Sequence, residues 1–211
     1  MLIVGAKGFA KEVLEIIHRN KETKQLVFFD DVNLDVYGKL YEQYPIFKHS
    51  SEAKEYFEKV DQKYTIGIGG PLLRKKMFDK FNNLGGVLTS TISDKAIIGS
   101  YNVNFGVGAN ILDGVLISND VTIGLASIIY YNSVITHDCI LGDFVEISPS
   151  VSILGRVEIG QFSHIGSGAI ILPGVKIGSN VIVGAGSVVT KDVGNNCVVV
   201  GTPAKIIKQI L

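Results

Sequence analysis

Two neighbouring residues in the second half of the chain, His137 and Asp138, have side chains suited to moving a proton near neutral pH. An imidazole, with an ordinary pKa of about 6.5, can accept a proton from an attacking nucleophile and later return it. A carboxylate that reaches the other ring nitrogen fixes the tautomer and raises the basicity of the ring. The pair therefore predicts a general base, although a surface histidine on a corner loop remains the alternative.

A second candidate site lies near the N-terminus. The segment Gly5–Gly8 separates a predicted strand at 2–4 from a predicted helix at 9–19. A strand, a glycine turn and a helix N-terminus together form a site for a phosphate, and Lys7 adds positive charge beside it. The turn matches a dinucleotide-binding glycine motif only in part, so glycines that serve tight packing alone remain an alternative.

Two further predicted strands end in residues that suit the same ligand. The strand at 26–29 is followed by Asp30 and Asp31, and an acidic residue at this place can hold a ribose or a base. The strand at 64–68 runs into a second glycine turn at Gly69. A segment of about 90 residues has room for three or four parallel strands but not for a full dinucleotide-binding domain. We therefore expect a nucleotide-linked substrate rather than NAD.

Charge is divided unevenly along the chain. The 211 residues carry 20 Lys and Arg against 20 Asp and Glu, so the formal net charge is zero. Of these charged residues, 28 lie in residues 1–95 and 12 in residues 96–211, whereas 8 glycines lie before this boundary and 16 after it. The contrast predicts two domains, 1–95 and 96–211.

The second domain repeats every six residues. From Phe105 onward, every sixth residue is large and apolar, and the residue two positions earlier is always small or β-branched. Neither a helical period of 3.6 nor simple alternation predicts this spacing. It is typical of a parallel β-helix, in which three hexapeptides form one triangular coil, and the fifteen repeats predict about five coils. The large apolar positions are Phe105, Ile111, Ile117, Ile123, Ile129, Ile135, Leu141, Ile147, Ile153, Ile159, Ile165, Ile171, Ile177, Val183 and Val189.

The repeat also predicts where other residues lie. His137 comes two residues after an inward position, so it should face outward at a corner, whereas Cys139 occupies a small inward position and should pack in the core. Glu146 and His164 are one coil apart and should stack on neighbouring coils. One set of glycines recurs at the spacing of a whole coil and should occupy a corner that needs a positive φ. These glycines are Gly106, Gly124, Gly142, Gly160 and Gly178.

The repeat resembles that of the hexapeptide-repeat acyltransferases, which fold as left-handed parallel β-helices, over about residues 96–204 and the closing GTPAK. The motifs GAKGFAKEVLEII, FFDD, IGIGG with RKK, THDC and GTPAK together resemble the PglD/NeuD-like sugar acyltransferases over nearly the whole chain. The resemblance implies a small Rossmann-like α/β domain at 1–95 that binds a nucleotide-sugar. It implies a left-handed β-helix at 96–211 that binds acetyl-CoA and ends in a short tail or helix. It also implies a homotrimer with acetyl-CoA between neighbouring prisms.

The resemblance also assigns roles to individual residues. His137 and Asp138 match the catalytic histidine and the acidic residue that follows it. The residues expected at acetyl-CoA are Glu146, His164, Ser167 and Ala185, the last two through their backbone. Those expected at the nucleotide-sugar are Lys7, Gly8, Phe9, Asp30, Asp31 and Gly69. The position of Glu146 is often histidine in the family, so an exposed Glu146–His164 ladder without a role remains the alternative.

The leading hypothesis is N-acetylation of a nucleotide-linked amino-deoxysugar, such as a 4-amino-4,6-dideoxyhexose, by direct transfer from acetyl-CoA with His137 as base. O-acetylation of a sialic acid or another sugar hydroxyl stays open, because amines and hydroxyls need the same base. A non-catalytic β-helix that binds a nucleotide-sugar is a third possibility. A γ-class carbonic anhydrase is also a β-helix, but it needs three histidines around zinc. Only His137 and His164 fall in the repeat, so the sequence does not favour this class.

Composition argues against several other classes. Balanced charge does not suit a nucleic-acid-binding protein or a polybasic membrane surface. Two cysteines, Cys139 and Cys197, are too few for a disulfide-rich scaffold, and their spacing is no metal motif. The apolar run before Gly5 is too short for a signal peptide. We therefore expect a cytoplasmic protein without a metal, a nucleic-acid partner or a membrane insertion.

Overall fold

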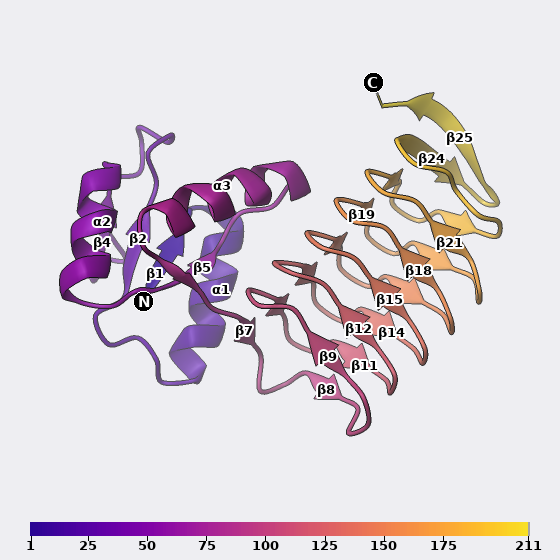
Figure 1. Cartoon of the computed structure of the whole chain (residues 1–211), viewed down its shortest axis with the longest axis horizontal. Helices are drawn as coiled ribbons and strands as arrows, with labels where there is room; N and C mark the ends of the chain where they lie inside the picture. The colour runs from indigo at the N-terminus through magenta and orange to yellow at the C-terminus, as the bar shows by residue number, and fades with distance from the viewer. Residues whose placement is uncertain (211) are drawn as a thin grey trace. The chain divides into compact units, whose positions relative to one another are not determined.

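The computed structural model describes residues 1–210 and separates the chain into two compact units (Figure 1). Unit 1 comprises Met1–Thr91, and unit 2 begins at Ile92. The three helices of the described residues all belong to unit 1, whereas unit 2 consists of short strands and turns. None of these helices is long and apolar enough to cross a membrane.

Unit 1 is built on one six-stranded sheet. Its strands are β1 (Leu2–Val4), β2 (Val27–Phe29), β3 (Lys39–Leu40), β4 (Tyr44–Phe47), β5 (Lys63–Ile66) and β6 (Val87–Leu88). The order across the sheet is β3-β4-β2-β1-β5-β6, and all neighbours run parallel except the β3–β4 hairpin. The central strand β1 is fully buried, and it is a continuous apolar run because both faces of a parallel sheet are covered.

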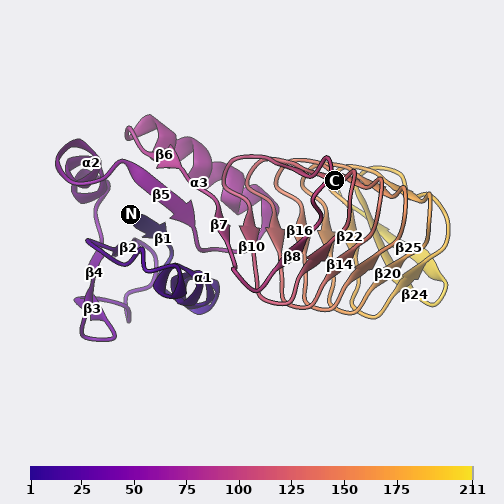
Figure 2. The same ribbon diagram turned by 90° about the horizontal axis from the view of Figure 1, so that it is seen from below.

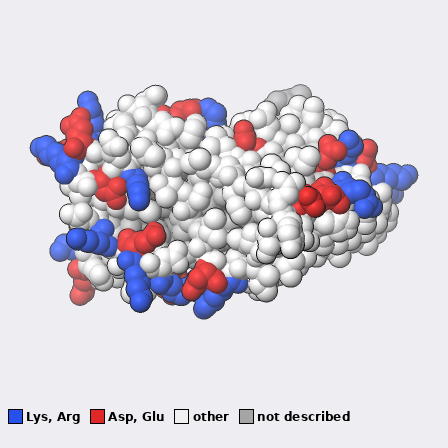
Figure 3. Space-filling model, turned by 60° about the horizontal axis from the view of Figure 1, so that its bottom comes forward, with Lys and Arg blue, Asp and Glu red and all other residues white. Residues whose placement is uncertain are grey.

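Helices α1 (Gly8–Arg19), α2 (Ser50–Lys59) and α3 (Pro71–Asn83) connect these strands. In Figure 2 the sheet lies between α1 on one side and α3 on the other. Helix α1 is amphipathic: Phe9, Val13 and Ile17, each four residues from the last, are buried. Charged side chains are denser over unit 1 than over unit 2 in Figure 3, as the counts along the sequence indicate.

The α/β class of this unit confirms the prediction, but the predicted number of strands was too small. The sequence pattern identifies β1, β2 and β5 and allows at most four strands, whereas the sheet has six. Strands β3 and β6 contain two residues each and are partly exposed. A run of two residues is too short for a sequence pattern to detect.

Unit 2 is a parallel β-helix whose two-residue strands stack into three faces. Face 1 contains β7 (Thr91–Ile92), β10 (Asn110–Ile111), β13 (Ile128–Ile129), β16 (Glu146–Ile147), β19 (His164–Ile165), β22 (Ile182–Val183) and β24 (Cys197–Gly201). Face 2 contains β8 (Ile97–Ile98), β11 (Leu116–Ile117), β14 (Val134–Ile135), β17 (Ser152–Ile153), β20 (Ile170–Ile171) and β23 (Val188–Val189). Face 3 contains β9 (Asn104–Phe105), β12 (Thr122–Ile123), β15 (Ile140–Leu141), β18 (Glu158–Ile159) and β21 (Lys176–Ile177).

The second residue of each of these two-residue strands packs inside the prism. Of the fifteen large apolar positions of the repeat, fourteen are at most 3% exposed, and Phe105 is partly buried against the same core. The small positions, such as Val121 and Val151, belong to this core as well. The predicted β-helix and its inward columns are therefore confirmed.

The β-helix begins earlier than the six-residue period indicates. Strand β8 pairs in register with β11, so Ile98 stacks beneath Ile117. These two residues are 19 positions apart, whereas Ile117 and Ile135 are 18 apart. One additional residue between β8 and β9 breaks the period, which is why the sequence pattern is regular only from Phe105 onward.

Each hexapeptide turns its corner through one residue in the left-handed conformation, with φ between 50° and 77°. The residues at this corner position are Asn102, Gly108, Gly114, Asp120, Ala126, Asn132, Asp138, Phe144, Ser150, Arg156, Phe162, Gly168, Gly174, Asn180 and Gly186. Glycine, asparagine and aspartate tolerate this conformation, but phenylalanine and arginine rarely adopt it alone. Stacking between coils therefore imposes the corner on whatever residue stands there.

The prediction that the coil-spaced glycines need a positive φ was wrong. None of Gly106, Gly124, Gly142, Gly160 and Gly178 has one. They are needed because the next coil passes too close for a side chain. A Cβ atom at Gly142 would lie 2.7 Å from the backbone nitrogen of Gln161, and one at Gly160 would lie 2.5 Å from that of Ser179.

The C-terminal segment is a strand, and the alternative of a terminal helix was wrong. Strand β25 (Ala204–Gln209) folds back antiparallel on β24. The hairpin extends the sheet of face 1 beyond the last full coil. Its side chains do not show the spacing of an amphipathic helix, since Ile206 and Ile207 are adjacent and both exposed.

The close approach of the coils predicts the effect of substituting a coil-spaced glycine. Gly142→Ala should lower the free energy of unfolding by about 1–3 kcal/mol, because the added methyl group meets backbone atoms that cannot move aside. Gly194→Ala is the matched control, since its Cβ meets nothing within 4 Å and its φ is not positive. Thermal unfolding of both variants measures the difference, and equal melting temperatures would contradict the steric explanation.

Candidate active site

His137 and Asp138 form the corner between faces 2 and 3, in the turn from β14 to β15. Asp138 is the left-handed residue of this corner, with φ 60°. Its Oδ2 lies 2.6 Å from Nδ1 of His137, and the imidazole is 53% exposed. When Nδ1 carries the proton and donates to this carboxylate, Nε2 keeps its lone pair and can accept a proton from a nucleophile.

The space around this imidazole depends on Gly155, which the sequence reasoning missed. Gly155 occupies the same corner one coil later, 18 residues after His137. A Cβ atom at Gly155 would lie 2.6 Å from Cε1 and 2.7 Å from Nε2 of His137. The glycine therefore leaves room for the ring in its present orientation. A search for small residues at the coil spacing from the histidine is the signal that finds it.

Glu146 and His164 stack on face 1 as the repeat predicts. They are register partners in β16 and β19, and Glu146 Oε1 lies 3.9 Å from His164 Nε2. The Ser148 hydroxyl lies 2.8 Å from the same nitrogen. In a Ser-His-acid triad the acid holds the other ring nitrogen, so this cluster is not one. Ser148 is also only 8% exposed, which argues against a nucleophile.

Ser167 and Ala185 lie on the corner between faces 1 and 2, on neighbouring coils. Both are exposed, and the carbonyl oxygen of Ser167 accepts a hydrogen bond from the Gly186 N–H at 2.8 Å. This corner and the His137 corner are the two edges of face 2. A single prism therefore does not bring His137 together with Ser167 and Ala185.

Cys139 lies beside the candidate base but does not belong to it. Its side chain is fully buried in the prism, where Sγ contacts the carbonyl oxygens of His137 and Leu154 at 3.5 Å and 3.3 Å. Burial raises the pKa of the Cys139 thiol. The thiol therefore stays protonated and packs in the core, which agrees with its small inward position in the repeat.

The N-terminal candidate site is a cavity of about 240 Å³ at the carboxyl ends of β1 and β5. The connections from these strands lead to opposite sides of the sheet, and such a point is where ligands bind in open α/β sheets. Five of the six residues predicted to bind a nucleotide-sugar line it: Lys7, Gly8, Phe9, Asp30 and Gly69. Its lining also includes Asn33 and Ile68, which the sequence reasoning did not identify.

Within this cavity, Asp30 serves its own loop. Its Oδ1 accepts hydrogen bonds from the backbone N–H groups of Val32 and Asn33 at 3.2 Å and 2.9 Å. The side-chain amide of Asn33 donates to both carboxylate oxygens. The ammonium of Lys48 donates to the carbonyl oxygens of Asp30 and Asn33 and ties the loop to β4. Asp30 therefore shapes the cavity wall.

The remaining two charged candidates take part in ion pairs. Asp31 does not line the cavity and pairs with Lys80 at 2.7 Å. Lys7 pairs with Asp35 at 2.8 Å, and this hydrogen bond lowers the pKa of the Asp35 carboxyl. Both Lys7 and Asp35 are largely exposed, so the pair can open without a large cost when an anion arrives.

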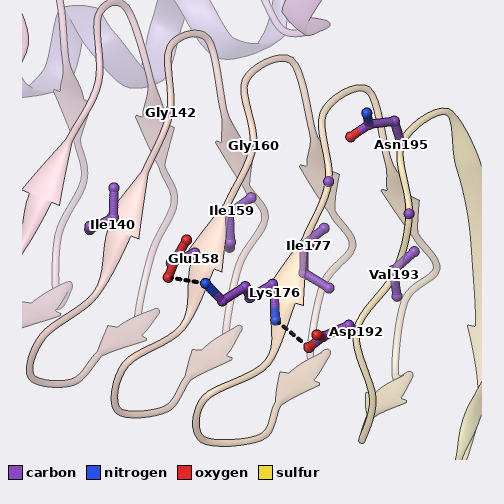
Figure 4. A pocket seen from close by; sticks show the side chains of 12 residues that line it. Ile140, Gly142, Glu158, Ile159, Gly160, Lys176, Ile177, Asp192, Val193 and Asn195 are labelled. Carbon is purple, nitrogen blue, oxygen red and sulfur yellow. Dashed lines mark hydrogen bonds and ion pairs between the residues drawn. The ribbon is translucent and has the colours of Figure 1, made fainter.

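An open hollow of about 440 Å³ also lies on face 3, over β15, β18 and β21 (Figure 4). The Lys176 ammonium pairs there with Glu158 at 2.8 Å, and the Lys176 backbone N–H donates to Asp192 at 2.8 Å. None of the predicted site residues, all of which lie in the described part of the chain, lines this hollow. It is an exposed part of the scaffold rather than a candidate active site.

Two family models match the chain. The model of the PglD N-terminal domain matches residues 1–81, and the model of the bacterial transferase hexapeptide (six repeats) matches residues 156–191. The first range includes all of the sheet of unit 1 except β6. The second falls wholly within the β-helix.

Solved structures resemble either nearly the whole chain or more than half of it. A variant of perosamine N-acetyltransferase from Caulobacter crescentus, in complex with CoA and GDP-perosamine, is 31% identical with a TM-score of 0.91, over 99% of this chain and 96% of that one. The acetyltransferase domain of PglB from Neisseria gonorrhoeae, in complex with acetyl coenzyme A, is 25% identical with a TM-score of 0.88, over 98% of each chain. A variant of AntD, an N-acyltransferase from Bacillus cereus, in complex with dTDP-4-amino-4,6-dideoxyglucose and CoA, is 25% identical with a TM-score of 0.54, over 58% of this chain and 81% of that one. The predicted left-handed β-helix is confirmed by these matches.

The different contacts of Asp30 and Asp31 predict different effects of removing them. Asp30→Ala should lower the free energy of unfolding by about 1–2 kcal/mol, because it leaves loop N–H groups without their acceptor. Asp31→Ala removes one half-exposed ion pair and should change it by less than about 0.5 kcal/mol. Urea denaturation measures both, and a larger loss for Asp31→Ala would contradict the structural role of Asp30.

Proposed function

The chain belongs to the PglD/NeuD-like sugar acetyltransferases, and from this membership we propose that it transfers the acetyl group of acetyl-CoA to the amino group of a nucleotide-linked amino-deoxysugar. The observation that carries the proposal is the match of both units to perosamine N-acetyltransferase, whose structure holds CoA and GDP-perosamine. The amino sugar bound to AntD supports an amine as the acceptor.

Unit 1 binds the nucleotide-sugar in this proposal. The diphosphate lies against the turn Gly5–Gly8, where the N-terminal end of α1 carries the positive end of the helix dipole and Lys7 can leave Asp35. Gly69 admits the ligand close to the main chain at the other side of the cavity. Phe9 is buried at the start of α1 and lines the same cavity.

Unit 2 supplies the base. Nε2 of His137 takes a proton from the sugar amine while the nitrogen attacks the thioester carbonyl carbon. The tetrahedral intermediate collapses, the carbon–sulfur bond breaks, and the imidazolium returns the proton to the thiolate of CoA. Asp138 holds the ring by Nδ1 and stabilises the imidazolium that forms between these steps. Backbone N–H groups stabilise the oxyanion, and a base of this kind contributes about 10²–10⁴-fold.

A trimer completes the site in this proposal. His137 and the expected acetyl-CoA residues Ser167 and Ala185 lie on the two edges of face 2. If face 2 of each prism turns toward a threefold axis, the His137 edge of one chain lies beside the Ser167 edge of the next, and the ring closes. Acetyl-CoA then lies between neighbouring prisms, while Glu146 and His164 on face 1 remain at its margin.

The outward side chains of the faces support this arrangement. Those of face 2 are uncharged and mostly apolar, whereas face 3 has charged residues at the same places. The outward residues of face 2 are Ile97, Leu116, Val134, Ser152, Ile170 and Val188. Those of face 3 are Asn104, Thr122, Ile140, Glu158 and Lys176. Exposed apolar side chains are unfavourable in water, so an apolar face suits a surface that a neighbouring chain covers.

The acceptor can be tested directly by measuring thiol release from acetyl-CoA with UDP-, dTDP- and GDP-linked 4-amino sugars, each beside the matching 4-hydroxy sugar. We expect release with at least one amino sugar and not with its hydroxyl counterpart. Release only with the hydroxyl sugars would replace N-acetylation by O-acetylation, and release with none would contradict acetyl transfer to this class.

The role of the base can be tested at two positions on one corner. His137→Ala should lower kcat by about 10²–10⁴-fold with the fold retained. Gly155→Ala should lower it by about 10²-fold, because the added methyl group displaces the imidazole. Gly194→Ala, which adds the same methyl group in open space, should keep wild-type turnover. Wild-type kcat in His137→Ala would exclude this residue as the base.

The trimer can be tested with one substitution placed on two faces. Ile170 on face 2 and Ile140 on face 3 are 37% and 53% exposed, and both are the outward residue of their strand. Ile170→Lys should place a charge in the trimer interface, convert the protein to monomers and abolish acetyl transfer. Ile140→Lys should leave both unchanged. Light scattering gives the mass, and a trimeric Ile170→Lys would show that face 2 is not the interface.

A further inference from the structure

Unit 1 contains a second hollow beside the cavity that we assign to the diphosphate. The two share Ala6, Lys7 and Gly8, so one ligand can lie across the glycine turn and extend into both. The second hollow has a volume of about 440 Å³, compared with about 240 Å³ for the first. It lies between α1 and the β3–β4 hairpin, which is labelled in Figure 2.

Aromatic and basic side chains line this hollow. The loop after β2 contributes Tyr37, and the hairpin contributes Lys39 and Tyr41. Helix α1 contributes Lys11, whose ammonium lies 5.8 Å from the centroid of the Tyr41 ring. This distance is within reach of a cation–π interaction.

The charges of the lining favour an anionic ligand. Lys7, Lys11 and Lys39 bring three ammonium groups to the hollow, and Asp35 brings its only carboxylate. Both partners of the Lys7–Asp35 pair are exposed, and each can turn toward a ligand. The lining therefore offers positive charge beside two exposed aromatic rings.

The backbone that presents Tyr41 is unusual. Tyr41 and Glu42 have φ values of 52° and 58°, and the Gln43 N–H closes the turn on the carbonyl oxygen of Leu40 at 3.2 Å. Two central residues with positive φ define a type I′ turn, which strongly prefers Asn-Gly. A bulky side chain is unfavourable in this conformation, and Tyr41 is 61% exposed. The ring therefore lies at the surface beside the Lys11 ammonium, where a ligand can reach it.

We propose that this hollow binds the nucleoside end of the nucleotide-sugar and that the Tyr41 ring stacks on the nucleobase. The inference rests on the proposed function, because it takes the ligand of the glycine turn to be a nucleotide-sugar. A flat aromatic base matches an exposed aromatic ring better than a sugar does. With the diphosphate on the shared turn and the base in the hollow, the sugar extends away from the hairpin, where its amine stays free to react.

The experiment replaces the ring without disturbing the turn. Tyr41→Asn introduces a residue that type I′ turns prefer, so the variant should melt no lower than the wild type. Tyr41→Phe keeps a stacking ring, and Tyr101→Asn removes another exposed tyrosine, from unit 2, as the control. Calorimetric titration with UDP, dTDP, GDP and inorganic pyrophosphate then measures the dissociation constant of each ligand for every variant.

In the wild type, at least one nucleoside diphosphate should bind more tightly than pyrophosphate. Tyr41→Asn should weaken that nucleotide by about 5- to 150-fold and leave pyrophosphate within twofold, whereas Tyr41→Phe and Tyr101→Asn should match the wild type. Unchanged nucleotide affinity in Tyr41→Asn, an equal loss for pyrophosphate, or a wild type that prefers no nucleotide would each overturn the proposal.

The same titrations separate this inference from the proposed reaction, because binding is measured without acetyl transfer. A wild type that binds a nucleotide through Tyr41 but releases no thiol with any amino sugar would contradict the reaction alone. A protein that acetylates an amino sugar while Tyr41→Asn keeps the wild-type nucleotide affinity would contradict the base site alone.

Discussion

The register between successive coils of the β-helix is the constraint on which the rest of unit 2 depends. Each two-residue strand pairs with the strand one coil later, so the inward residues stack on their counterparts 18 positions along the chain. The chain must then turn each corner within the few residues between two strands. It does so through one residue in the left-handed conformation, even where that residue is Phe144 or Arg156. Apolar columns, left-handed corners and the glycines at closely approaching backbones are three consequences of this one register.

The same register fixes the position of the candidate base. His137 precedes a left-handed residue on a corner that has a coil on both sides. Backbone hydrogen bonds to these two coils hold the turn in place. Gly155 follows at the same corner one coil later and leaves the ring its space. A catalytic group held in this way needs little reorganisation during the reaction. The edges of one prism point in different directions, so His137 and the expected acetyl-CoA residues lie apart within one chain. The proposed site therefore needs a second chain.

Periodicity made the β-helix predictable from sequence, and local chemistry made the rest harder. Isoleucine at every sixth position reports the core, because burial selects the side chain directly. The coil-spaced glycines were located correctly but explained wrongly, since spacing alone does not distinguish a positive φ from a close approach of two backbones.

The first strands of the β-helix were not predicted, because one extra residue breaks the six-residue period before Phe105. Strands β3 and β6 were not predicted because a strand of two residues is too short to show a pattern. Asp30 lines the N-terminal cavity, but only its contacts show that it organises a loop.

The two units place charge according to what each must do. A prism filled by stacked apolar columns has no interior place for an ion, so its few charges lie on outward positions such as Glu158 and Lys176. In unit 1, lysines line an open hollow beside the loops at the carboxyl ends of the strands, and an anion can reach them there. Recognition of a charged, flexible nucleotide and rigid positioning of a base make opposite demands on a chain. In the proposed function, dividing them between a loop-bearing sheet and a register-locked β-helix satisfies both. The zero net charge of the whole is the sum of +2 over residues 1–95, with 15 basic and 13 acidic residues, and −2 over residues 96–211, with 5 basic and 7 acidic residues.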